Sequence, residues 1–248
     1  MHFYYIAIVK QFNIMNIVIL SRNKELYSTR RLLEEAEKRN HLVEVIDPLD
    51  CNLIIENEKP TIYYKGKYLN YVDAIIPRIG ASVTFYGCAV VRQFEMMNVF
   101  SSVSSDAILK SRDKLRSFQY LSKLGIDMPK TVFTNYSKDI DNHIVKVGGP
   151  PVVIKLLEGT QGIGVILAET NITAESILET FNGLEARALI QEYIAEAKGA
   201  DLRVLIVDNH VVGAMKRQGK EGEFRSNLHR GGTYRRYKLS DQEIKIAL

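Results

Sequence analysis

PVVIKLLEGTQGIGVILAE, residues 151–169, consists of two apolar runs joined by a glycine-rich segment. The apolar runs predict two strands. Glycine has no side chain, so Gly159, Gly162 and Gly164 would let backbone N–H groups approach an anion closely. A Walker loop would require Gly-Lys-Ser/Thr, and a dinucleotide fingerprint would place its glycines before a helix. A glycine loop between strands instead predicts a flap over phosphates, with a ligand-free hairpin as the alternative.

Two lysines accompany this segment. Lys155 lies within the first apolar run. Burying an ammonium group without a partner is costly, so we expect Lys155 to face a cleft or an anion. Lys114, in the segment RDKL, stands at the start of a predicted helix. By itself it is less informative, because a lysine in that position is more often a solvated surface residue.

Polar residues mark the ends of two further predicted strands. Gln191 and Glu192 end the run ALIQE, and Asp201 and Arg203 begin the run DLRVLIV. A strand that ends in Gln-Glu-Tyr can offer backbone groups to a purine edge and a carboxylate to a ribose. From the residues alone, surface charges at strand ends are the simpler interpretation.

Basic residues are concentrated between 216 and 236 among glycines and small polar residues. They are Lys216, Arg217, Lys220, Arg225, His229, Arg230, Arg235 and Arg236. Guanidinium groups bind phosphates and carboxylates in a bidentate manner. An RNA-binding loop is the alternative, but Phe224, Tyr234 and Tyr237 are too few and too scattered for a base-stacking platform. The segment therefore favours a site for ATP phosphates and an acidic substrate.

Residues 15–102 predict an open, largely parallel α/β layer. Strands are expected at 16–21, 42–47 and 73–77, helices at 26–40 and 83–97, and a hairpin about Lys65-Gly66. Residues 1–14 are apolar, but Lys10 interrupts them and a membrane span needs about 20 apolar residues. We interpret them as an extension before Met15, with Met1 or Met15 as the start. The sequence thus predicts no membrane segment and a cytoplasmic location.

Residues 103–248 predict a second domain. Helices are expected near 104–110, 113–124, 139–147 and 173–182, and strands at 131–134, 151–158, 162–169, 188–194, 201–207 and 210–217. In the last stretch, Ser240 is a plausible N-cap, with Glu243 three residues later. That helix ends with the sequence after little more than two turns.

The composition fits an ordinary globular protein, with 46% hydrophobic and 25% charged residues. A formal charge of +4 suits anionic ligands without indicating nucleic acid. Cys51 and Cys88 stand far apart without CxxC spacing, which favours two buried thiols over a metal or redox site.

In this order, these clusters resemble the ATP-grasp carboxylate–amine ligases, and in detail the RimK family of ribosomal-protein glutamate ligases. The resemblance covers residues 15–248. It rests on ILSRNKELYS, HLVEVIDPLDC, DAIIPRIGASVTFYG, RQFEMMN, SRDKLRSFQYLSKLGIDMP, VKVGGPPVVIKLLEGTQGIGVILAET, LIQEYIAEAKGADLRVLIV and KEGEFRSNLHRGG. It implies an α/β ATP-grasp fold: a Rossmann-like domain at 15–102, then an incomplete ATP-grasp domain at 103–248.

The resemblance also implies roles for single positions. ATP phosphates would be held by Lys114, Lys155 and a flap of Gly159, Thr160, Gln161, Gly162 and Gly164. Adenine would meet Glu192 and Tyr193, the ribose Asp201, and the nucleotide also Arg225, Ser226 and Asn227. Arg203, His229 and Arg230 are similar to residues lining the acyl-phosphate site, and Arg203 and Arg230 are the candidate catalytic residues. The Mg²⁺ or Mn²⁺ ligands of the family are expected beyond Leu248, so the sequence assigns no metal ligand.

The implied function is the ATP-dependent addition of glutamate to the C-terminus of a small-subunit ribosomal protein through an acyl phosphate. Two alternatives stay open: an amino-acid ligase that acts on a small-molecule acid, and a non-catalytic nucleotide-binding fragment. A homo-oligomer is compatible with the sequence. Because the metal segment is missing, we expect this chain to be a poor or inactive ligase as it stands.

Overall fold

The structure is a computed structural model that describes residues 14–134, 139–158 and 163–248. The chain forms two compact units, Met1–Arg112 and Asp113–Leu248. The sequence placed a domain boundary at 102, ten residues before this division. Helix α3 (Ser105–Arg112) accounts for the difference, because the Glu95 carboxylate on α2 accepts hydrogen bonds from the Ser105 N–H at 2.8 Å and its hydroxyl at 2.7 Å.

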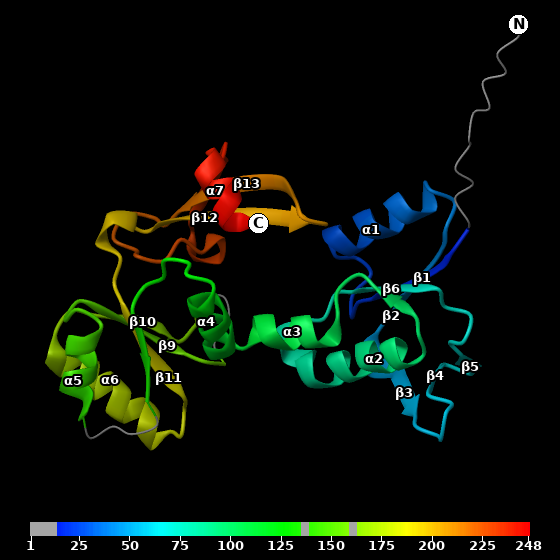
Figure 1. The fold of residues 1–248 in the computed structure, drawn as a ribbon, viewed down its shortest axis with the longest axis horizontal. Coiled ribbons are helices and arrows are strands. Elements are labelled where there is room, and N and C mark those ends of the chain that lie inside the picture. Colours follow the sequence, from blue (N-terminus) through cyan, green and yellow to red (C-terminus); the bar gives the residue numbers. More distant parts are fainter. Residues whose placement is uncertain (1–13, 135–138, 159–162) are drawn as a thin grey trace, which may run out of the picture. The chain divides into compact units, whose positions relative to one another are not determined.

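The first unit is built on a parallel sheet of order β2-β1-β6-β7. Its strands are β1 (Asn16–Leu20), β2 (Leu42–Ile46), β6 (Ala74–Pro77) and β7 (Phe100–Ser101). Figure 1 shows α1 (Tyr27–Glu37) and α2 (Thr84–Met96) on opposite sides of this sheet. The alternation of strand side chains explains this: Val18 and Leu20 face the α2 core, whereas Ile17 packs with Ala36 of α1.

A small antiparallel sheet completes this unit, with strands β3 (Cys51–Ile54), β4 (Thr61–Tyr64) and β5 (Lys67–Tyr68). The predicted hairpin about Lys65-Gly66 is confirmed, and Gly66 has φ +91°. Leu69, which follows β5, is completely buried, and its N–H donates to the Ile62 carbonyl of β4 at 2.9 Å. The sequence analysis missed β3.

The second unit contains an antiparallel sheet of order β10-β9-β11-β8. Its strands are β8 (Thr131–Phe133), β9 (Val152–Leu156), β10 (Val165–Ala168) and β11 (Ala188–Glu192). Helices α5 (Ile140–Lys146) and α6 (Asn171–Gly183) cover one face, where Val152, Ile154 and Ile190 are buried among their side chains. The opposite face of β9 therefore carries Val153 and Lys155.

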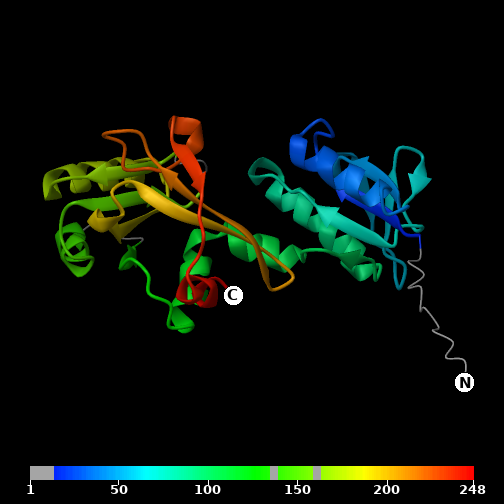
Figure 2. The ribbon, with the colours of Figure 1, turned by 90° about the horizontal axis from the view of Figure 1, so that it is seen from above.

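A second antiparallel sheet of this unit consists of β12 (Ala200–Val207), β13 (His210–Gln218) and β14 (Thr233–Arg236). The β12–β13 hairpin is the long yellow-to-orange ribbon of Figure 2. Two further helices are α4 (Lys114–Lys123) and α7 (Asp241–Ala247). The predicted capping box is confirmed, since Ser240 and Glu243 exchange side chain-to-backbone hydrogen bonds.

Candidate functional site

A row of polar side chains crosses the second unit's sheet on the face away from α5 and α6. The Lys155 ammonium donates to the Gln191 side-chain oxygen, and the Gln191 amide nitrogen donates to the Thr131 hydroxyl at 2.8 Å. Gln191 lies directly opposite Thr131 and diagonally across from Lys155, so strand register brings the three together. Lys155 thus lies on the sheet face opposite α5 and α6, and its predicted contact with an anion stays a prediction.

Lys114 reaches the same strand from the start of α4. The Asp113 side chain caps this helix by accepting from the Arg116 N–H at 3.0 Å. The Lys114 ammonium donates to the carbonyls of Leu156 at 2.9 Å and Leu157 at 2.6 Å, at the end of β9. Two lysines that are 41 positions apart in the sequence, 155 minus 114, thus converge at one strand end.

The surroundings of the two ammonium groups lower the pKa of both lysines. Burial lowers the pKa of Lys155, and the nearby charge of Lys114 lowers it further. Burial also lowers the pKa of Lys114, although Glu158 partly opposes this. Glu158 itself pairs with Arg187. An anion bound here would stabilise both ammonium groups, so the arrangement suits a phosphate.

Of the predicted phosphate flap, only Gly164 belongs to the described residues; Gly159, Thr160, Gln161 and Gly162 lie outside them. Gly164 has φ +69°, and its carbonyl accepts from the Leu156 N–H at 2.8 Å. This bond ties the end of the flap to the strand that carries Lys155.

Glu192 ends β11 and Tyr193 follows it, and both side chains contact residues outside this strand. The Glu192 carboxylate accepts from the Lys130 N–H at 3.0 Å, and the Glu192 N–H donates to the Lys130 carbonyl at 2.9 Å. The Tyr193 ring meets the Phe224 ring edge-on, with centroids 6.5 Å apart. Their predicted contact with adenine stays a prediction.

Asp201 forms a two-point ion pair with Arg217 across the β12–β13 pair. The distance from Arg217 Nε to an Asp201 oxygen is 2.8 Å, and the Arg217 side chain is only 11% exposed. Burial opposes ionisation of Asp201, yet hydrogen bonds from Arg217 and the buried Ser226 together lower its pKa. Arg203 lies exposed on the same strand and adds positive charge nearby. Sequence reasoning did not single out Arg217 among its basic neighbours.

The segment 223–230 has its own ion pair. Arg225 donates to both oxygens of Glu223 at 2.8 Å and to the Val165 carbonyl of β10 at 3.0 Å. Hydrogen bonds from Arg225 are the main reason why the pKa of Glu223 is lowered to about 2, and the charges of Arg225 and Arg230 add to the effect. The Glu223 carboxylate is therefore held by Arg225, and its side chain is only 15% exposed. Asn227 precedes a short turn, Leu228–Arg230, that includes His229.

A cavity of about 510 Å³ lies between α4 and β8, and Thr131 at the end of the polar row contributes to its wall. Leu115, Phe118, Met128 and Phe133 supply most of its apolar lining.

Cys51 and Cys88 are buried free thiols, as predicted, and burial raises the pKa of Cys51 to about 12. No cluster of three acidic, histidine or cysteine side chains that could hold a metal ion occurs in the described part of the chain. Within the described ranges, no helix combines the length and apolar character needed to cross a membrane.

Comparison with protein families gives two matches that together span most of the chain. Residues 15–108 match the RimK PreATP-grasp domain, and residues 111–248 match the RimK-like ATP-grasp domain. Two relatives named "Probable alpha-L-glutamate ligase" are similar over 94% of this chain and 78% of their own length. The one from Aliivibrio salmonicida is 60% identical, and the one from Saccharophagus degradans is 61% identical.

Solved structures agree on the fold. A RimK domain protein ATP-grasp from Sphaerobacter thermophilus has a TM-score of 0.69 and 20% identity, covering 94% of this chain and 79% of that one. D-alanyl-alanine synthetase A from Vibrio cholerae has a TM-score of 0.64 and 13% identity, covering 95% and 78%. The predicted α/β ATP-grasp fold is therefore confirmed.

Proposed function

Because the chain belongs to the RimK family of ATP-grasp ligases, and is thus an ATP-dependent ligase, we propose that it adds glutamate to the C-terminus of a small-subunit ribosomal protein. The names of its relatives support glutamate as the amine substrate. The ribosomal acceptor is the finer part of the proposal. It rests on the resemblance of segments such as RQFEMMN and EFRSNLHRGG to this family.

The reaction must make an unreactive carboxylate electrophilic. In the first step, a carboxylate oxygen of the acceptor attacks the γ-phosphorus of ATP, and ADP leaves. In the second step, the glutamate amine attacks the acyl carbon, inorganic phosphate leaves, and the amine loses a proton. This chemistry needs no side-chain nucleophile, so catalysis depends on positioning and on charge neutralisation.

We assign the charge neutralisation to Lys114 and Lys155, which would contact ATP phosphates beneath the flap. The nucleotide would be held further by Glu192, Tyr193, Asp201, Arg225, Ser226 and Asn227. Arg203 and Arg230 would stabilise the acyl phosphate. Mg²⁺ or Mn²⁺ would reduce phosphate repulsion, but the described residues do not fit a metal site, and no step is assigned to one.

One observation carries the proposal. Lys114 and Lys155 converge on β9, and burial together with mutual repulsion lowers the pKa of Lys155. Such a pair is stabilised by an anion and destabilised without one. A site that binds ATP phosphates explains this arrangement better than a structural role does.

The test is calorimetric titration of ATP into the Lys155→Met variant. Methionine keeps most of the apolar volume and removes the charge. A charge-assisted hydrogen bond is worth about 1.5–3 kcal/mol, so ATP affinity should fall about ten- to a hundredfold. Lys123→Ala, at the exposed far end of α4, is the control and should bind ATP normally. Unchanged ATP affinity in Lys155→Met would contradict the proposal.

The acceptor is tested separately by offering radiolabelled glutamate with two kinds of acid. Incorporation into a peptide with the acidic C-terminus of a small-subunit ribosomal protein would support the proposal. Incorporation into small-molecule acids alone would keep the ligase activity and overturn the ribosomal acceptor.

A further inference from the structure

The first unit contains a topological switch point that the ATP site does not use. From β1 the chain passes to β2 on one side, and it later returns to β6 on the other side. The carboxyl ends of β1 and β6 therefore lie side by side at this point. In open α/β sheets, ligands bind outside the carboxyl ends of strands at such a point.

Two arginines occupy this position. Arg22 follows β1, and Arg78 follows β6 directly. Each reaches toward the segment that follows the other strand: Arg22 donates to the Ser82 hydroxyl at 3.3 Å, and Arg78 donates to the Ser28 hydroxyl, in the first turn of α1, at 3.0 Å. Both arginines are exposed. The two guanidinium groups thus lie over the switch point, each held by a serine.

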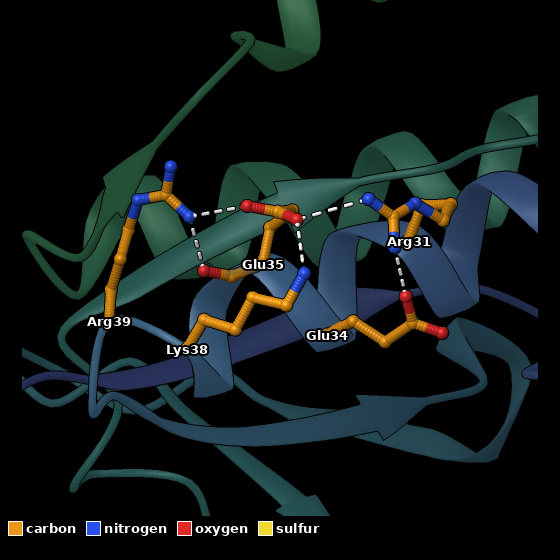
Figure 3. Close-up of polar contacts among 5 residues, drawn as sticks. All are labelled: Arg31, Glu34, Glu35, Lys38 and Arg39. Carbon is orange, nitrogen blue, oxygen red and sulfur yellow. Dashed lines mark hydrogen bonds and ion pairs between the residues drawn. The ribbon is translucent and has the colours of Figure 1, made fainter.

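Neither arginine has an acidic partner among the described residues of the unit. In the described part of the chain, no ion pair involves Arg22 or Arg78, and each guanidinium has only a hydroxyl as its side-chain partner. On α1 and just after it, by contrast, the cations drawn in Figure 3 are paired with acidic neighbours: Arg31, Lys38 and Arg39 with Glu34 and Glu35. Arg22 and Arg78 therefore keep their charge available for a ligand.

The backbone reinforces this positive charge. Helix α1 begins after Leu26 and α2 begins after Val83, each close to one of the two serines. Neither helix has a side-chain cap, and neither has an acidic residue in its first turn. The uncapped first turn of α1 leaves N–H donors and a partial positive charge that favour an anion, whereas at α2 the preceding turn Ala81–Val83 already bonds the Thr84 N–H to the Ala81 carbonyl.

We propose that Arg22 and Arg78, with Ser28 and Ser82, form a carboxylate-binding site on the first unit that holds the acidic substrate of the ligase. This assignment rests on the proposed function, which requires a carboxylate-bearing substrate besides ATP. Guanidinium groups match a carboxylate in a two-point geometry. The ATP phosphates have their own cations, Lys114 and Lys155, in the second unit.

The test is calorimetric titration of three probes into the full chain: free glutamate, a peptide that ends in two glutamates, and ATP. In the double variant Arg22→Gln/Arg78→Gln, affinity for glutamate or for the peptide should fall by about tenfold or more, while ATP affinity stays unchanged. The probe that loses affinity identifies which carboxylate substrate occupies the site.

Arg92→Gln is the matched control, because Arg92 is also exposed but lies near the carboxyl end of α2. It should bind all three probes like the wild type. If the double variant has a lower melting temperature than the wild type, Arg78→Lys replaces it. Lysine keeps the positive charge but cannot bind a carboxylate at two points as a guanidinium does, so it should still weaken carboxylate binding. The proposal is overturned if the wild type binds neither carboxylate probe, or if the arginine variants bind both normally. If the wild-type chain instead fails to bind ATP, the proposed function itself is contradicted.

Discussion

Replacing Gly164 with alanine tests how closely the end of the predicted phosphate flap is packed on β9. A Cβ at this position would lie 2.5 Å from Cδ1 and 2.9 Å from Cβ of Leu156. A left-handed φ of +69° costs an L-residue about 1–2 kcal/mol, and overpacking adds about 1–3 kcal/mol. Alanine also reduces unfolded-chain entropy, which offsets about 0.4–1 kcal/mol. We expect a net destabilisation of about 2–4 kcal/mol.

Gly125→Ala supplies the control. Gly125 has the same φ of +69°, but a Cβ added there would meet no atom within 4 Å beyond its chain neighbours, so only the backbone effects apply. Its destabilisation should be about 1 kcal/mol or less. Urea denaturation measures both, and with slopes of about 1–3 kcal/mol per molar, Gly164→Ala should lower the midpoint by roughly 0.7 M or more. Equal midpoints for the two variants would refute the packing argument.

Three other outcomes are expected. ATP affinity should fall as pH rises from about 7 to about 10, because only protonated Lys155 binds phosphate and its pKa is lowered; calorimetry of Lys155→Met should show a weaker pH dependence. The Glu223–Arg225 pair should stabilise the fold above the ordinary glutamate pKa of about 4.5 and lose that effect toward pH 2, so Glu223→Gln should melt with less acid sensitivity than the wild type. Phe94→Ala should cost about 3–5 kcal/mol in urea denaturation, since Phe94 is fully buried; a loss below about 1 kcal/mol would contradict that packing.

Much of the fold followed from local patterns. The apolar runs around Lys155 predicted β9 and β10, and their antiparallel pairing with Val165 opposite Lys155 agrees with a short loop between strands. The start of α7 could be predicted from Ser240 and Glu243, because a capping box involves only residues that are three positions apart. Strand β3 was missed because its residues, CNLI, form a short run without clear alternation.

The site was harder to predict because it depends on register across distant strands. Gln191 lies 36 positions from Lys155 and 60 from Thr131, and nothing in its neighbourhood indicates these partners. Arg217 likewise has several basic neighbours in the sequence. Only its position opposite Asp201 in the β12–β13 pair distinguishes it. The sequence singled out Lys155 and Asp201 as candidates, but their partners Gln191 and Arg217 became clear only from the pairing of the strands.

Gln191 and Glu192 show why neighbouring residues need separate roles. Successive side chains of a strand point to opposite faces, so the two cannot serve one ligand through their side chains in the same way. Gln191 accepts a hydrogen bond from Lys155 and so orients it. The Glu192 carboxylate instead accepts from the Lys130 N–H, and the Glu192 N–H donates to the Lys130 carbonyl. One carboxylate oxygen and the N–H of Glu192 are thus bound within the protein, so the proposed nucleotide contact by Glu192 would use its other polar atoms. Tyr193 follows directly where the strand ends, and its ring packs against Phe224.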